Sequence, residues 1–190
     1  MAVETEAKIQ VADHEALRER LGQLGAKCQA ERLEVNIYFD TAEGELLKSD
    51  RALRLRSIGE KNVLTYKGPA RKGKYKQRLE IQTAIADGQA VRRLLGELGF
   101  AQSLVFEKRR QSWLLDECRV ELDSLPLLGA FVEVEGPCEA AIGQVLCKLG
   151  LDKADLIATP YPILLRDQLE RTGNVSREIR FVQPKASGDS

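Results

Sequence analysis

The sequence of 190 residues lacks several ingredients of common enzyme sites. It has a single histidine, His14, which argues against a Ser-His-Asp triad and against a thiol-imidazole nucleophile. The four cysteines include no C-x-x-C pair, so a zinc site is not indicated, and we expect free, mostly buried thiols at Cys28, Cys118, Cys138 and Cys147. Any catalysis must therefore use carboxylates, cations, tyrosine or a metal ion.

Net charge and long apolar runs are also missing. The 29 Lys and Arg residues balance 29 Asp and Glu residues, so overall charge would not hold the chain on nucleic acid or on an anionic membrane. No run approaches the roughly 18 apolar residues of a membrane span, and the acidic start MAVETEAKIQ does not resemble a signal peptide. We expect a cytoplasmic protein with no nucleic-acid partner and no membrane partner.

What the chain does have is alternation of apolar and charged residues, typical of half-buried strands. Helical periodicity appears in residues 13–25, 87–99 and 137–150, each ending in glycine, and again in residues 161–173. This order predicts an α+β protein with an antiparallel sheet. One domain would span residues 1–173, and a mobile tail would span residues 174–190. The eight predicted strands are residues 3–9, 36–40, 52–57, 63–67, 77–82, 106–115, 119–123 and 131–136.

Residues two apart in a strand share a face, and here one face of nearly every strand is fully charged. An ordinary sheet with one solvated face is the simplest explanation for any single strand. However, like charges recur two apart, as in Glu4 with Glu6 and Arg54 with Arg56, and such pairs repel unless an ion of opposite sign binds between them. The remaining charged positions on this face are Lys8, Lys67, Arg78, Glu80, Lys108, Arg110, Glu121, Asp123, Glu133 and Glu135.

If the strands close into a barrel with the charged face inward, the helices can cover the apolar outside and no edge remains. Carboxylates would then line one part of the interior, and Lys and Arg another. Carboxylate oxygens suit Mg²⁺ or Mn²⁺, whereas Arg and Lys suit phosphates. The pattern favours a site for a metal-bound polyphosphate.

At these residues the sequence resembles the CYTH superfamily, the triphosphate tunnel metalloenzymes. The E-x-E-x-K signature stands at residues 4–8, and the resemblance extends over about residues 3–165. Tyr161 to Leu165 also resemble a late family motif, with Pro160 where the family often has Ser. The other matches are Y-F-D-T at 38–41, L-R-L-R at 53–56, Y-K-G-P at 66–69, R-L-E at 78–80, E-K-R-R at 107–110, V-E-L-D at 120–123 and G-A-F-V-E-V-E at 129–135.

The resemblance implies a closed eight-stranded antiparallel β tunnel with helices packed outside. It implies that the triphosphate is bound by Lys8, Arg54, Arg56, Lys67 and Arg110; Arg78 and Lys108 are further candidates because they share the charged face. It implies that Mg²⁺ or Mn²⁺ is held by Glu4, Glu6, Asp123, Glu133 and Glu135; Glu80 and Glu121 are further candidates because they share the charged face. In relatives that hydrolyse triphosphates, a tyrosine and a lysine at the positions of Tyr38 and Lys67 help to polarise the attacking water.

The resemblance is closer to class IV adenylate cyclases than to short inorganic triphosphatases. It implies an enzyme that converts ATP to cyclic AMP and pyrophosphate. The alternative is hydrolysis of thiamine triphosphate, a nucleoside triphosphate or inorganic tripolyphosphate. A non-catalytic polyphosphate-binding module and a plain β domain with solvated charges are two further alternatives. The sequence leaves a homodimer open.

Overall fold

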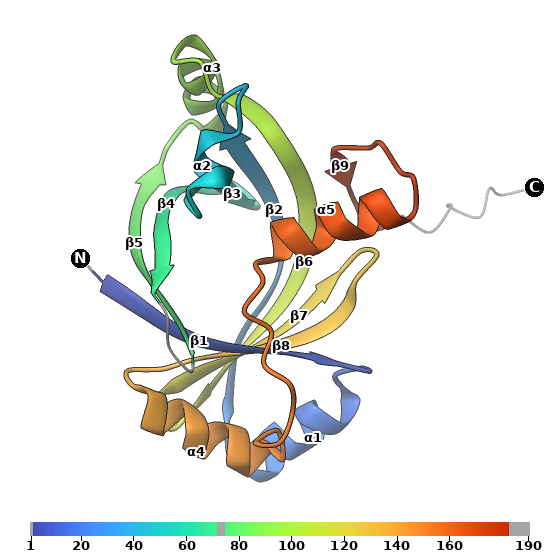
Figure 1. Cartoon of the computed structure of the whole chain (residues 1–190). Coiled ribbons are helices and arrows are strands. Elements are labelled where there is room, and N and C mark those ends of the chain that lie inside the picture. The colour runs from blue at the N-terminus through green and yellow to red at the C-terminus, as the bar shows by residue number, and fades with distance from the viewer. Residues whose placement is uncertain (1, 72–74, 183–190) are drawn as a thin grey trace, which may run out of the picture.

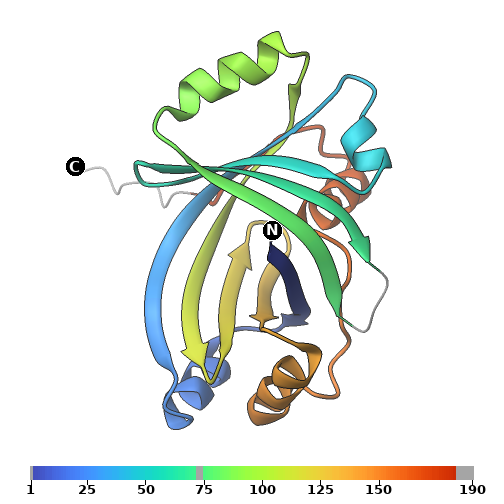
Figure 2. The ribbon, with the colours of Figure 1, turned by 90° about the vertical axis from the view of Figure 1, so that its left-hand side faces the viewer.

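The computed structural model describes residues 2–71 and 75–182, with side chains from residue 5 onward, and its main feature is a closed barrel (Figures 1 and 2). Within the described residues, eight strands form a ring in the order β2-β3-β4-β5-β1-β8-β7-β6, and β2 pairs with β6 to close it. Every pairing in this ring is antiparallel, so the predicted eight-stranded antiparallel tunnel is confirmed. The strands are β1 (Ala2–Val11), β2 (Lys27–Asp40), β3 (Ala52–Ile58), β4 (Lys61–Arg71), β5 (Lys76–Ile85), β6 (Ala101–Leu115), β7 (Cys118–Leu125) and β8 (Gly129–Glu135).

Two helices cover the outside of β1, β7 and β8, at the bottom of Figure 1. These are α1 (Glu15–Gln23) and α4 (Glu139–Leu149). Alternation in the strands supplies their apolar partners, because Ile9 and Val134 point outward from positions next to the charged Lys8 and Glu133. Leu21 of α1 and Ile142 of α4 are fully buried in this cluster. Burial of these side chains stabilises the charged interior by fixing the strands around it.

Helix α3 (Gly88–Glu97) packs on the outside of β2 and β3 at the other end of the barrel. Asp87 caps its first turn by accepting hydrogen bonds from the backbone N–H groups of Gln89 and Ala90. Gly99, with φ +87°, follows the helix in the left-handed conformation, as the sequence predicts for a helix-ending glycine. The buried Leu95 packs against Leu55 of β3.

Helix α5 (Tyr161–Arg171) packs differently, because its partners point into the barrel. Phe106 of β6 and Phe131 of β8 share strand parity with Lys108 and Glu133, which line the interior. They contact α5 residues that include Leu165, which is fully buried. The last helix therefore fills the inner face at one end of the barrel.

Three features depart from the sequence expectations. Strand β2 begins at Lys27, nine residues before the predicted start, and a short helix α2 (Glu45–Lys48) follows it. All four cysteines are free thiols, but only Cys118 is buried, so the expectation of mostly buried thiols is wrong. Cys28 near the start of β2, Cys138 at the N-cap of α4 and Cys147 within α4 are exposed.

The expected mobile tail begins at residue 174, yet part of it packs on the barrel. Strand β9 (Glu178–Ile179) pairs in parallel with β6, and Ile179 is buried beside α5. The backbone N–H of Phe181 donates to a Glu107 carboxylate oxygen at 2.9 Å. Residues 183–190 of the expected tail lie outside the described residues. Among the helices that the structure describes, none combines the length and apolar character that a membrane span requires.

Candidate active site

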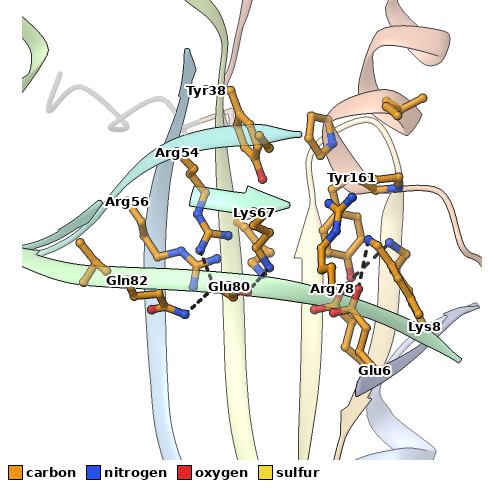
Figure 3. Close-up of a pocket in the computed structure, with 18 of the residues that line it drawn as sticks. Glu6, Lys8, Tyr38, Arg54, Arg56, Lys67, Arg78, Glu80, Gln82 and Tyr161 are labelled. Carbon is orange, nitrogen blue, oxygen red and sulfur yellow. Dashed lines mark hydrogen bonds and ion pairs between the residues drawn. The ribbon is translucent and has the colours of Figure 1, made fainter. Parts of the chain in front are cut away.

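A cavity of about 360 Å³ lies inside the barrel, and all eight barrel strands contribute to its lining (Figure 3). Tyr161 and its neighbours at the start of α5 complete the wall. The barrel thus brings together side chains from stretches far apart in the sequence. The predicted site residues that line it are Glu6, Lys8, Tyr38, Arg54, Arg56, Lys67, Arg78, Glu80, Lys108, Arg110, Glu121, Glu133 and Glu135.

Strand β3 supplies Arg54, a buried cation whose hydrogen-bonding capacity is only partly used. Arg54 is buried, and its NH2 group donates to Thr65 Oγ1 at 3.3 Å. Among the described residues, the Nε–H of Arg54 has no hydrogen-bond acceptor. A buried donor without an acceptor is costly, so an anionic ligand in the cavity would relieve this cost. Two residues along, Arg56 faces the same cavity (Figure 3).

Strands β1, β7 and β8 supply carboxylates that stand directly opposite one another. Glu6 is paired with Glu135 across β1 and β8, and Glu121 with Glu133 across β7 and β8. Like charges at such positions are destabilising unless a cation lies between or beside them. Arg110 supplies one such cation, with its NH2 group 2.5 Å from Glu133 Oε2.

The two signs of charge are less segregated than the sequence predicts, because the register interleaves them. Lys8 stands opposite Glu133, and Lys67 stands opposite Glu80. The Lys67 Nζ lies 2.7 Å from Glu80 Oε2, and Arg54 NH2 lies 3.9 Å from Glu80 Oε1. Glu80 therefore lies on the cationic side of the cavity, away from the paired carboxylates.

Asp123 lies behind the side chains that line the cavity. It is fully buried and is absent from the lining, unlike the other described carboxylates predicted as metal ligands. Arg110 donates to it through Nε at 2.6 Å and NH2 at 2.5 Å, and Lys108 donates at 3.1 Å. The Tyr161 hydroxyl donates to Asp123 Oδ2 at 3.0 Å. Glu4, another predicted ligand, has its side chain outside the described part of the chain.

A family model for the CYTH domain matches residues 2–141 of this chain. The chain belongs to the CYTH family. This CYTH protein is 30% identical over 133 residues to a candidate adenylate cyclase of Methanocaldococcus jannaschii, covering 70% of this chain and 76% of the relative.

Solved structures of other proteins share its fold. The PH1012 protein of Pyrococcus horikoshii is 26% identical with a TM-score of 0.75, covering 85% of this chain and 98% of the other. A candidate adenylyl cyclase of Hippeastrum, described as having a dominant triphosphatase activity, is 19% identical with a TM-score of 0.70, covering 88% and 96%. The second likeness, at this identity, bears on the fold alone.

Burial lowers the pKa of three of the cavity cations in this CYTH protein, whereas Asp123 and Glu133 raise that of Arg110. Burial, together with the neighbouring charge of Arg54, lowers the pKa of Arg56 to about 10. Burial also lowers the pKa of Lys8, against the opposing effect of Glu133. Burial and the nearby Arg110 lower the pKa of Lys108. A bound anion would stabilise the charged form of each group.

The cavity carboxylates fit a divalent metal that is coordinated partly by the protein and partly by the phosphate oxygens of a substrate. In the part of the chain that the structure describes, no three His, Cys, Asp or Glu side chains are grouped closely enough to hold a metal by themselves. Glu6, Glu133 and Glu135 nevertheless face the cavity from adjacent strands. Mg²⁺ commonly takes one or two carboxylates and completes its shell with water and phosphate oxygens. Family membership implies a divalent metal, and these oxygens are the right type for it.

The sequence reasoning missed three residues that shape the site. Glu34 is fully buried, and its Oε2 lies 3.5 Å from Lys108 Nζ and 3.2 Å from Arg56 Nε. Arg32 and Tyr161 both line the cavity. Glu34 and Arg32 precede the predicted start of their strand at residue 36, although they continue the parity of Asn36 and Tyr38. Extending that strand by period two would have found them.

Proposed function

We propose that this protein binds the triphosphate of ATP in the barrel cavity and, with a divalent metal ion, converts ATP to cyclic AMP and pyrophosphate. The observation that carries the proposal is the enclosed convergence of Arg54, Arg56 and Lys67 with the Glu6–Glu135 and Glu121–Glu133 pairs. Similarity to the archaeal relative named as a candidate adenylate cyclase supports the choice of reaction.

The cations hold the triphosphate in this proposal. Arg54 and Arg56 contribute planar guanidinium groups that match phosphate oxygens, and Lys8 and Lys67 contribute compact charges. Arg78, Lys108 and Arg110 add positive charge around them. Like Lys67, which pairs with Glu80, these cations have carboxylate partners: Asp50 for Arg78 at 2.7 Å, and Asp123 for Lys108 and Arg110. Lys and Arg outnumber Asp and Glu among the lining residues, which favours a polyanionic substrate.

The cavity-facing carboxylates Glu6, Glu133 and Glu135 would hold Mg²⁺ or Mn²⁺, with Glu4 as a fourth candidate on the same strand as Glu6. Glu121 is a further candidate, although it accepts a hydrogen bond from Ser112. When bound, such a metal neutralises phosphate charge and supports departure of the leaving phosphate.

In the proposed cyclisation, the ribose 3′ hydroxyl attacks the α-phosphorus. The new O–P bond forms as the bond to the β-phosphate oxygen breaks, and the hydroxyl proton is lost to solvent or to a basic group. Pyrophosphate leaves with the electron pair of the broken bond. The cations hold the β- and γ-phosphates while they become the leaving group, which is where negative charge increases.

Hydrolysis of a triphosphate is the second candidate, and the position of Tyr38 favours it. Tyr38 and Lys67 both line the cavity, and Figure 3 places them on the same side of it. Tyr38 is held by stacking on Phe106, with ring centroids 5.7 Å apart. In this alternative, water attacks the terminal phosphorus, and a diphosphate product leaves. Inorganic tripolyphosphate and thiamine triphosphate are then substrates to test beside ATP.

Product analysis separates these functions. The purified chain is incubated with ATP and Mg²⁺ or Mn²⁺, and the products are resolved by chromatography. Cyclic AMP with pyrophosphate supports the cyclase, whereas ADP with phosphate supports the hydrolase. If neither forms, and thiamine triphosphate and tripolyphosphate also remain intact, the enzymatic proposal is wrong. Binding of tripolyphosphate without turnover would then identify a non-catalytic binding module.

A further inference from the structure

Three cations that line the cavity, on β2, β3 and β6, contact the same buried carboxylate, that of Glu34. Glu34 has no exposed surface and is not part of the cavity lining. Its Oε1 lies 3.0 Å from Arg32 Nε, and its Oε2 lies 3.2 Å from Arg56 Nε and 3.5 Å from Lys108 Nζ. One buried carboxylate thus contacts three cations that line the cavity.

The way Glu34 contacts the two arginines matters for their orientation. In both Arg32 and Arg56 the Nε atom faces Glu34, so this edge of each guanidinium is turned away from the cavity. The Arg56 Nε–H donates its hydrogen bond to Asn36 Oδ1 at 3.0 Å, and the Glu34 carboxylate lies beside it as an ion-pair partner. Arg56 lines the cavity, and phosphate oxygens bound there would accept from its terminal nitrogens.

Charge explains why Glu34 stays ionised in this place. Burial by itself would raise the pKa of its carboxyl, but Lys108, Arg56, Arg110 and Arg32 together hold that pKa well below its usual range. Because the carboxylate is both charged and tightly packed, it restrains the orientation of the cationic side chains that contact it. Asp123 has the same relation to Arg110, through Nε at 2.6 Å.

We infer that Glu34 is a positioning residue for triphosphate binding: it sets the orientation of Arg32, Arg56 and Lys108 and does not itself touch the substrate. The inference rests on the proposed function, because it assumes that these cations bind phosphate. It adds a residue that lies outside every recognised motif of the sequence.

Two substitutions distinguish positioning from simple charge balance. Glu34→Asp keeps the negative charge but withdraws the carboxylate by one methylene, so a positioning role predicts about tenfold weaker binding. Glu34→Gln keeps the length but removes the charge. If Glu34 only offset positive charge, Glu34→Gln would bind the polyanion more tightly than wild type, and Glu34→Asp would bind as wild type. A positioning role predicts weaker binding by both. The exposed Glu31→Gln on the same strand is the matched control.

The experiment is calorimetric titration of each folded variant with inorganic tripolyphosphate, followed by steady-state kinetics with the substrate that wild type turns over. We expect a raised Kd and KM with kcat little changed for both Glu34 variants, and wild-type values for Glu31→Gln. Circular dichroism checks folding, and Glu34→Asp retains the charge that folding needs if Glu34→Gln does not fold. Wild-type Kd and KM in Glu34→Asp, or tighter binding by Glu34→Gln, would overturn the inference while leaving the proposed function intact. Failure of wild type to bind tripolyphosphate would overturn both.

Discussion

The two halves of the barrel wall carry both signs of charge but balance them differently. In β2 to β5, cations predominate, and Arg54 keeps a buried Nε–H without an acceptor among the described residues. In β1 and β6 to β8, carboxylates stand opposite one another, as in the Glu6–Glu135 pair. Under the proposed function, the first half would bind the anionic triphosphate and the second half the divalent cation. Changes in the two halves should therefore affect different kinetic constants.

The largest effect is expected in the carboxylate half. Glu135→Gln removes one oxygen ligand and one charge from the Glu6–Glu135 pair, so metal-dependent turnover should fall about 100-fold or more. The fold should be retained, because the change also removes repulsion. The measurement is kcat as a function of Mg²⁺ or Mn²⁺ concentration, with the exposed Glu117→Gln as control. An unchanged metal dependence would remove Glu135 from the proposed ligand set.

A smaller effect, on a different constant, is expected in the cationic half. Arg54→Ala removes a buried guanidinium that faces the cavity, so KM for the triphosphate should rise about tenfold. The metal concentration at half-maximal activity should change little. Steady-state kinetics with Arg93→Ala, an exposed α3 variant, as control would test this. If Arg54→Ala altered metal dependence and Glu135→Gln altered only KM, the division between the two halves would be wrong.

The pairing of like charges could be anticipated from the sequence, whereas their cross-strand partners could not. Alternation in residues 4–8 and 131–136 predicts which side chains share a face, because period two is a local property. It does not predict that Glu80 faces Lys67 or that Lys8 faces Glu133, because register depends on closure of the whole barrel.

The burial of charged residues was the second feature of the site that the sequence did not predict. Asp123 has the parity of a cavity residue, but Arg110 and Lys108 of β6 and Tyr161 of α5 enclose it. Glu34 was not among the predicted site residues because the strand was predicted to begin at residue 36, whereas β2 begins at Lys27. A longer strand would have placed Glu34 on the charged face, but the burial of both carboxylates behind the cavity depends on tertiary contacts that a single strand pattern does not contain.

Helices α1 and α5 differ in the same way, because α1 packs away from the cavity and α5 packs beside it. Leu21 of α1 and Leu165 of α5 are both fully buried, but only Leu165 belongs to the cluster that includes the cavity residue Tyr161. Replacing either with Ala should lower the free energy of unfolding by about 2–5 kcal/mol. Leu165→Ala should also raise KM a fewfold, and Leu21→Ala should leave it unchanged. Equal KM values for the two variants would mean that α5 does not shape the site.

The smallest effect concerns the junction of the two halves, where Glu34 contacts Arg56 and Lys108. Since folding lowers the pKa of Glu34, its ionised form stabilises the protein above the unfolded pKa of about 4.3, and this stability is lost as pH falls through the lower folded pKa. The difference in unfolding free energy between wild type and Glu34→Gln should be constant above about pH 6 and shrink below about pH 4. Urea unfolding at several pH values measures it. A difference that grows on acidification would contradict the assigned charge state.

Calorimetric titration with tripolyphosphate tests the central claim most directly, because it asks only whether the interior of the barrel binds a triphosphate chain. We predict saturable binding of one molecule per chain, strengthened by Mg²⁺ or Mn²⁺ and weakened about tenfold by Arg54→Ala but not by Arg93→Ala. Absence of binding, or binding that Arg93→Ala weakens as much as Arg54→Ala does, would contradict the account.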